Sequence, residues 1–464
     1  MSINKIGFLT APRLNPVTRA MRLTVIIVMV LSFTMQSRAD DFRQLLSYYM
    51  NEAVRNNPGL MAKKQTLKAA EARISEARAE MLPSLDFSSR YTRAGGGREF
   101  IFDLNPFGIP MVIRENFMRE REHDTKFTLT QPLFAGGSFY YNYRTTKYLK
   151  KSSEYQYQSE TEDLKLETGE AYITCLSAIE NVKAVEKSVE RAEELLRITG
   201  IKLRTQTGVA ADTLRARAEL AAAESQFTAA RNNSALAAKQ LAKLSGIEAV
   251  KIQLPDNLPI PQEIMFREED INYYEEMART NRSEMKQLSE AIESTKSAEK
   301  AVRGTFMPAF VLAADYGWQG EDYKLNKDYD AWIVSGVLKW NLFKGFGDKN
   351  RLREAKIKSR ELELMKKDLT ADLQLNARAA VLEYENAYTE WNSMKASLSA
   401  AEENYRIRKV LYETGSGTIL EMLDAAELLQ KSTSGEIVSR YRTILAQIKL
   451  NRASGSDVLN LTIK

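Results

Sequence analysis

The chain has 464 residues, with 66 Lys and Arg against 61 Asp and Glu, one His and one Cys. The lone Cys175 excludes an intrachain disulfide. Because His123 is the only histidine, a His/Cys metal cluster and most Ser-His-Asp catalytic arrangements are excluded as well. The net charge of +5 arises from residues 1–39, which hold five basic and no acidic residues. The remainder is close to neutral, so its composition does not predict nucleic-acid binding.

Residues 1–39 have the pattern of a secretory signal peptide. Basic residues precede an apolar run over 23–31, and Ser37-Arg38-Ala39 offers small residues at the positions that a signal peptidase reads. The mature chain is therefore expected to begin at Asp40, with Met1 or Met21 as the start of translation. The alternative is a membrane anchor, but the run is roughly half of the ~20 residues that a spanning helix needs.

A helix is expected over 41–81, and a β-hairpin over 84–131 follows it. Leu85, Phe87 and Tyr91 alternate with polar residues, which is the strand pattern. Gly95-Gly96-Gly97 lies between strands and opens no helix, so it predicts a loop and not a phosphate site. No role follows from the apolar stretch Phe100–Ile113 inside this loop.

A long helix is predicted from Ser138 to a tip turn near Gly208. No proline interrupts it, and apolar residues recur at spacings of three and four, as in a coiled coil. A shorter helix over about 210–244 returns from the turn, so two short helices end to end would match one long helix. The first structural repeat is therefore predicted over 40–246, followed by a proline-containing equatorial connector over 247–268.

The same order of elements returns in the second half of the chain. Residues 133–137 (LFAGG) recur as 342–346 (LFKGF), a shift of 209 that also carries Gly208 onto Gly417. Such a fixed register predicts a duplicated structural unit. The second repeat is expected over 269–455, with a β-hairpin over 309–340, a tip turn near 417 and a C-terminal tail over 456–464.

The four predicted strands are each about ten residues long, which suits a tilted strand that crosses a bilayer. The alternative is a pair of amphipathic hairpins packed on a soluble core. Four strands cannot close a barrel, because even the smallest barrels use about eight. An open sheet is not tolerated in lipid, so a barrel would have to be shared between chains, in a number that the strands alone leave open.

Four blocks of sequence together resemble the TolC-like outer-membrane factor family, the outer membrane efflux proteins. The most specific block is 412–425 (YETGSGTILEMLDA), and the others are 53–58 (AVRNNP), 77–85 (ARAEMLPSL) and 131–137 (QPLFAGG). The resemblance implies a mainly α fold with a membrane β-barrel portion. Three chains would form a 12-stranded barrel in the outer membrane on a 12-helix periplasmic tunnel.

The resemblance also implies a function and partners. The homotrimer would be the exit duct of a tripartite efflux or type I secretion system. It would be fed by an inner-membrane pump or ABC exporter through a periplasmic adaptor (membrane fusion protein) and held in outer-membrane lipid. Neither a cofactor nor an enzymatic activity is implied. The absence of a Cys after Ala39 departs from the lipidated, drug-efflux branch of the family and leans towards the unlipidated members, which also serve type I secretion.

The resemblance implies a periplasmic entrance gate at Glu421 and Asp424. These residues are three apart on a helix and therefore share a face. In a trimer they would form two stacked carboxylate rings, which attract cations. The alternative is a solvated acidic face at a helix N-terminus, where Glu and Asp are favoured.

Asp212 is the equivalent of Glu421 in the first repeat. In the family an aspartate here can meet the tyrosine that matches Tyr412 and help to hold the tips closed. The family's gate-latching arginine would fall at Gly417, so that latch is missing from this chain. The alternative is that Asp212 only caps the start of its helix.

The two tip turns are expected to contact the adaptor, again by resemblance. A positive φ in a tight helix-to-helix turn would explain the glycines at 208 and 417 without any partner. The residues concerned are Gln206, Thr207, Gly208, Gly415, Ser416 and Gly417.

A passive duct competes with two other interpretations. One is a periplasmic coiled-coil scaffold that never enters the membrane, against which the alternating strands with aromatic ends argue. The other is an enzyme, for which no nucleophile–base pair or metal set is found in the sequence. The cargo cannot be named from the sequence, because drugs, metals, polysaccharides and proteins can all leave through such a duct.

Overall fold

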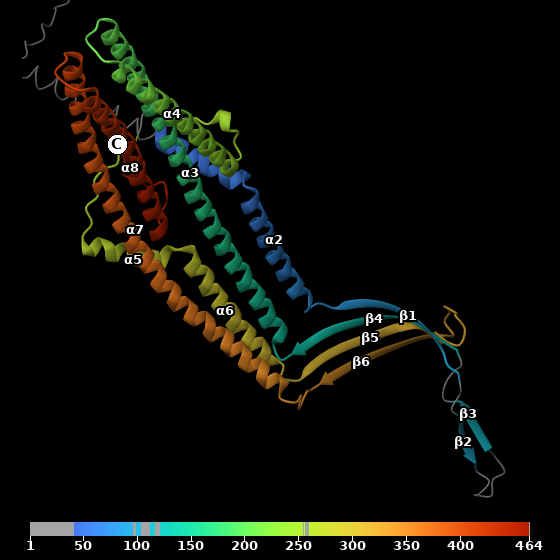
Figure 1. Ribbon diagram of the computed structural model, residues 1–464. Helices are drawn as coiled ribbons and strands as arrows, with labels where there is room; N and C mark the ends of the chain where they lie inside the picture. Colours follow the sequence, from blue (N-terminus) through green and yellow to red (C-terminus); the bar gives the residue numbers. More distant parts are fainter. Residues whose placement is uncertain are drawn as a thin grey trace, which may run out of the picture. The chain divides into compact units, whose positions relative to one another are not determined.

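The computed structural model is mainly helical with a smaller sheet portion, as predicted (Figure 1). It describes residues 41–95, 99–103, 112–116, 121–253, 255 and 259–463. The predicted signal peptide and two of the three glycines at 95–97 lie outside the described residues. The described residues divide into two compact units, one built from those within 41–62, 158–282 and 370–463 and the other from those within 63–157 and 283–369.

The helices follow the duplicated order. A helix over 41–56 is followed by α2 (Pro58–Ala79), α3 (Ser138–Arg204), α4 (Ala210–Ser245) and the short η2 (Ala249–Lys251). The second half contains α5 (Glu268–Asn281), α6 (Ser283–Gly304), α7 (Gly347–Glu413) and α8 (Ile419–Ser454). Both α3 and α7 have 67 residues, about 100 Å at 1.5 Å per residue. Both α4 and α8 have 36 residues.

Each expected leading helix is broken in two, which the sequence interpretation missed. The first breaks at Asn57, whose side-chain oxygen accepts a hydrogen bond from the Leu60 amide at 3.2 Å, so that Pro58 begins α2. Proline is suited to the first position of a helix and unsuited to its interior. The second breaks at Arg282, which ends α5 in an extended conformation before α6 begins.

In the first unit the two returning helices bury the same heptad of small residues. On α4 these are Ala216, Ala223, Ala230 and Ala237, and the shift of 209 carries them onto α8 as Ala425, Ser432, Ser439 and Ala446. All eight side chains are buried. A repeat of seven keeps one face of a helix against its neighbour, and small side chains let the two backbones approach closely. The duplication therefore extends to the packing of the helices.

The second unit contains a four-stranded antiparallel sheet in the order β1-β4-β5-β6. Its strands are β1 (Ser84–Arg93), β4 (Arg121–Ala135), β5 (Ala309–Gly320) and β6 (Asp330–Lys339). Each predicted hairpin forms, and the β4–β5 pairing joins the two repeats. Strands β1 and β6 are the edges of this sheet.

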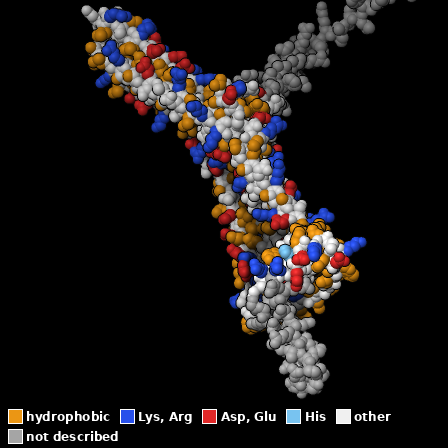
Figure 2. All heavy atoms as spheres, turned by 90° about the vertical axis from the view of Figure 1, so that its right-hand side faces the viewer, with side chains coloured by type: hydrophobic (Ala, Val, Ile, Leu, Met, Phe, Trp, Pro, Cys, Tyr) orange, Lys and Arg blue, Asp and Glu red, His pale blue; other side chains and the backbone are white. Residues whose placement is uncertain are grey.

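One face of the sheet is apolar and exposed. The strand register aligns Phe87, Phe127, Tyr316 and Trp332 in a row across all four strands, and the exposed fraction of Trp332 is 73%. On the opposite face β1 and β4 carry polar residues, and Thr128 donates a hydrogen bond to Asp315 at 2.5 Å. The same face of β6 carries the exposed Ile333 and Val337. Figure 2 shows hydrophobic side chains gathered over this region. An exposed apolar face that runs across all four strands indicates an interaction surface.

The segment between β1 and β4 is more ordered than a simple loop. Strands β2 (Glu99–Asp103) and β3 (Val112–Asn116) pair as a separate two-stranded sheet. The ends of the apolar stretch 100–113 therefore belong to a hairpin, while residues 104–111 lie outside the described residues.

Candidate functional site at the helix tips

The two tip turns close in the same way. In the first tip (205–209) the amides of Thr207 and Gly208 both donate to the Lys202 carbonyl, at 2.9 and 3.0 Å. In the second tip (414–418) the amides of Ser416 and Gly417 donate to the Leu411 carbonyl, both at 2.9 Å. These bonds satisfy carbonyls that a helix end otherwise leaves without a partner.

The expected positive φ does not lie at Gly208 or Gly417. It lies two residues earlier, at Gln206 (58°) and Gly415 (80°). The glycines at 208 and 417 serve a different purpose, which is close approach to the preceding helix. A Cβ on Gly208 would lie 2.8 Å from the Lys202 Cβ, and one on Gly417 would lie 3.0 Å from the Leu411 Cβ.

We expect the two positive-φ positions to respond differently to substitution. A left-handed non-glycine residue costs roughly 1–2 kcal/mol, so Gly415→Ala should destabilise the second tip by about that amount. Gln206→Gly should be neutral or slightly stabilising, because relief of strain offsets the added backbone freedom of glycine. Thermal unfolding of the two variants measures the difference. A stabilising Gly415→Ala would contradict the described turn.

Glu421 takes part in the start of α8. Its carboxylate accepts from the Thr418 amide at 3.2 Å, and its own amide donates to the Thr418 hydroxyl at 3.3 Å, which is a reciprocal capping box. The exposed carboxylate also lies 3.4 Å from the guanidinium of Arg408 on α7. Sequence analysis did not identify Arg408.

Asp424 is exposed one turn further along α8. The buried face of this helix start is formed by Ile419, Met422 and Ala425. If Glu421 and Asp424 face water, Leu420 and Leu423 are expected to form the apolar seam of this helix. This expectation is wrong for Leu420, which is 55% exposed, whereas Leu423 packs on the core.

Tyr412 is buried where the ends of α3 and α7 meet the starts of α4 and α8. It packs with Leu195, Ala216, Ile419 and Met422. The Lys202 ammonium donates a hydrogen bond to the Tyr412 carbonyl and lies 4.3 Å from the centre of its ring. Lys202 therefore ties the first tip to the second. The only sequence signal for it is a basic residue in the last turn of α3.

Asp212 lies near Tyr412 without bonding to it. Burial, and next the charge of Asp212, raise the pKa of Tyr412 above its usual value. Among the described hydrogen bonds, none joins the Asp212 carboxylate to the Tyr412 hydroxyl. Asp212 is not the cap of α4 either, because Val209 occupies that position.

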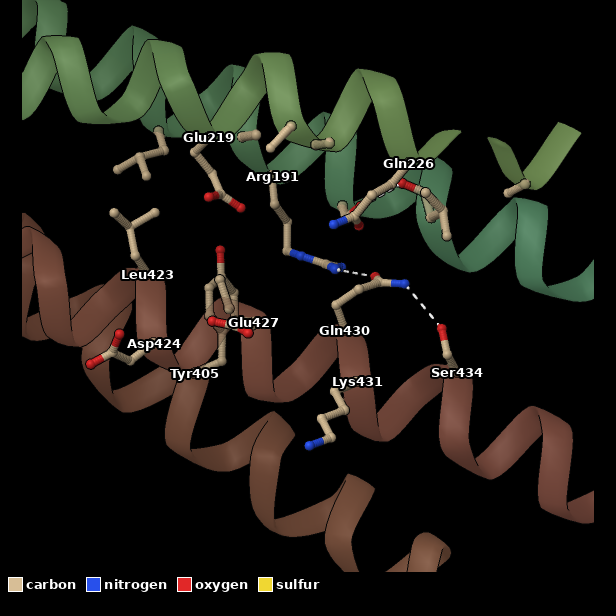
Figure 3. Close-up of a pocket in the computed structure, with 18 of the residues that line it drawn as sticks. Arg191, Glu219, Gln226, Tyr405, Leu423, Asp424, Glu427, Gln430, Lys431 and Ser434 are labelled. Atoms are coloured by element: carbon tan, nitrogen blue, oxygen red, sulfur yellow. Dashed lines mark hydrogen bonds between the residues drawn. The ribbon is translucent and has the colours of Figure 1, made fainter. Parts of the chain in front are cut away.

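A cavity of about 580 Å³, lined by both polar and apolar side chains, lies behind the second tip. Figure 3 shows Arg191 and Glu219 directed into it from α3 and α4, opposite Glu427 and Gln430 of α8. Arg191 donates to the Gln430 side chain at 3.1 Å. Burial and then the charge of Glu427 raise the pKa of Glu219, while burial lowers the pKa of Arg191. The two helical hairpins thus meet here partly through polar contacts.

Across the described residues, no cluster of three or more His, Cys, Asp and Glu side chains could hold a metal ion. The same part of the chain contains no helix both long and apolar enough to cross a membrane.

The chain thus has a duplicated set of helical hairpins and a four-stranded sheet with an exposed apolar face. The chain belongs to the outer membrane efflux protein family, whose model matches residues 49–247 and 275–456. It is therefore a channel protein of the outer membrane that extends into the periplasm, and not an enzyme, as the resemblance implied.

Similar proteins agree with this assignment over most of their length. The alkaline protease secretion protein AprF of Pseudomonas aeruginosa is 22% identical over 439 residues, which cover 91% of this chain and 87% of AprF. TolC of Escherichia coli is 21% identical, with 94% and 86% covered. The open state of the MtrE channel of Neisseria gonorrhoeae superposes with a TM-score of 0.73 at 16% identity, covering 89% of each chain. The Campylobacter jejuni CmeC channel gives 0.72 at 18% identity, with 89% of this chain and 85% of CmeC covered. The fold prediction is thus confirmed.

Proposed function

We propose that three copies of this chain form the exit duct of a tripartite efflux or type I secretion system. An inner-membrane pump or ABC exporter would deliver cargo through a periplasmic adaptor to the helix tips, and the cargo would leave through the shared barrel. The observation that carries this proposal is the four-stranded sheet with one exposed apolar face and two open edges.

The open edges require other copies of the chain. Unpaired backbone groups cost several kcal/mol each in hydrocarbon, so β1 and β6 need partners there. Pairing β6 of one copy with β1 of the next satisfies both edges with a single type of contact. Three copies reach twelve strands, above the minimum of about eight for a barrel.

The tips are the proposed adaptor-binding surface. Gln206, Thr207, Gly415 and Ser416 are exposed, and the two close-approach glycines beside them are half-buried. The equal closure of both turns would give six similar docking points around a trimer. The relative AprF carries protein secretion in its name, which favours a type I secretion partner among the alternatives.

Crosslinking and conductance test the duct together. The protein extracted from outer membranes in detergent is expected to crosslink to a ceiling of three chains. The same preparation should form long-lived conducting pores in planar bilayers. A periplasmic scaffold would be extracted without detergent and would not conduct. A stable monomer in lipid would contradict the shared sheet.

A further inference from the structure

The turn between β6 and α7 carries a backbone strain that the first repeat avoids. Gly345 and Phe346 both have positive φ, of 56° and 63°. The shift of 209 maps them onto Gly136 and Gly137, which have φ of 62° and 79°. The turn therefore needs two left-handed residues, and the second repeat fills one of them with a bulky aromatic residue. A bulky residue in this conformation is strained relative to a relaxed backbone.

The strained residue belongs to an exposed apolar group, called here the aromatic turn (residues 340–346). The exposed fractions of Leu342, Phe343 and Phe346 are 79%, 72% and 64%. The rings of Phe343 and Phe346 touch edge to face, with their centres 5.4 Å apart. The turn follows directly after the exposed apolar face of β6, so the two apolar surfaces are continuous along the chain.

A basic segment begins at the same turn. Residues 339–358 contain seven Lys and Arg against two acidic residues. A cation in the first turn of a helix opposes the helix dipole, so helix stability does not explain Lys349. Arg351 pairs with Asp348 at 3.3 Å and Lys358 with Glu354 at 2.6 Å.

The remaining cations of this helix start share one face. Lys349, Arg353 and Lys356 follow the spacing i, i+4, i+7 and are exposed. No ion pair involves them among the described residues. We call these three residues the basic face. The first repeat carries a related set at the shift of 209, where Leu133, Phe134 and Tyr140 are exposed and are followed by Arg144 and Lys147.

We propose that the aromatic turn and the basic face form a binding site for anionic phospholipid at the periplasmic surface of the outer membrane. Phe343 and Phe346 would enter the acyl-chain boundary, and the basic face would bind headgroup phosphates. The proposal deepens the proposed function, because it assumes that the sheet of this chain lies in the bilayer.

Two physical arguments favour lipid over a protein partner. Basic residues beside a membrane surface are attracted by anionic lipid, and aromatic side chains prefer the headgroup level. The site is also continuous with the sheet face proposed to contact lipid. Strain at Phe346 is then offset by insertion of its ring, which explains why the second repeat departs from the Gly-Gly turn of the first.

Lipid-dependent stability tests the basic face. The full-length protein in detergent is expected to unfold at a higher temperature when phosphatidylglycerol is added than when phosphatidylcholine is added. Lys349→Gln/Arg353→Gln/Lys356→Gln should lose more than half of that difference. The matched control is Arg351→Gln/Lys358→Gln, in which both residues are already paired, and it should keep the difference. Inorganic phosphate at the same concentration should have no effect.

Phe346→Gly separates insertion from folding. Without lipid, this variant should unfold at the same temperature as the wild type or higher, because the strain is removed. With phosphatidylglycerol, it should gain less than the wild type. If the triple Gln variant and Phe346→Gly both gain as much stability from phosphatidylglycerol as the wild type does, the proposal is overturned. Loss of trimer crosslinking in Phe346→Gly would assign the turn to a subunit interface instead. Conductance of the wild type is measured in parallel, so a failure of the duct itself is recognised separately.

Discussion

Neutralising both carboxylates of the second tip while keeping the helix cap is expected to remove cation selectivity without loss of folding. The suitable change is Glu421→Gln with Asp424→Asn. Glutamine can replace glutamate in a capping box, so the reciprocal bonds with Thr418 remain possible. At ~10 Å and an effective dielectric near 20, each carboxylate is worth about 1–2 kcal/mol to a permeating ion. Six of them in a proposed trimer would dominate the entrance.

Planar-bilayer recordings check this prediction. The ratio of cation to anion permeability should fall towards unity, and block by divalent or trivalent cations should disappear. Glu413→Gln is the matched control, because that carboxylate is exposed at the end of α7 and outside the proposed rings. Unchanged selectivity and block in the double variant would contradict the gate assignment.

Two further variants sharpen the interpretation. Glu421→Ala removes the cap as well as the charge, so it should also lower stability by about 1 kcal/mol. Arg408→Gln should act in the opposite direction to the double variant, because it frees Glu421 from its ion partner at 3.4 Å. If Glu421 only caps α8 and has no role in permeation, both Glu421→Ala and Arg408→Gln should leave the ion selectivity unchanged.

The duplicated fold is predictable from the sequence because its signals are local and repeated. The LFAGG and LFKGF blocks, the period-two strands and the uninterrupted apolar seams each constrain only a short segment. A constant shift between the two halves then orders them. The break at Asn57 does have a sequence signal, because Pro58 is unsuited to a helix interior and suited to the first position of α2. The break at Arg282 has no proline beside it and is marked only by the non-helical backbone of that residue.

The tips are predictable only in part, because their important contacts join distant positions. The Lys202–Tyr412 hydrogen bond spans 210 residues of sequence, and the Arg191–Gln430 bond spans 239. No local pattern signals either contact. The left-handed residues were misplaced for a related reason. The turn is set by two amides that share one carbonyl, and that closure moves the positive φ to Gln206 and Gly415.

The second large effect is expected from Lys202, which links the two tips. Its ammonium bonds the Tyr412 carbonyl and lies over the ring of the same residue. A hydrogen bond from a charged donor contributes about 1.5–3 kcal/mol and a cation–π contact about 0.5–2. If the described packing is that of the closed entrance, Lys202→Met removes both contacts while retaining an apolar stem of similar length.

Lys202→Met should therefore raise the leak through the resting channel by at least tenfold, since about 1.4 kcal/mol changes a two-state equilibrium by that factor. Tyr412→Phe should have a smaller effect, because it keeps the ring and the carbonyl and removes only the hydroxyl near Asp212. Lys409→Met is the control, a half-buried cation at the end of α7 that lies 3.9 Å from Glu413. Single-channel open probability and antibiotic sensitivity of cells report the leak. If Tyr412→Phe and Asp212→Asn leak and Lys202→Met does not, the tips are held by the Asp212–Tyr412 pair, and the ammonium contact serves only the packing of the helix ends.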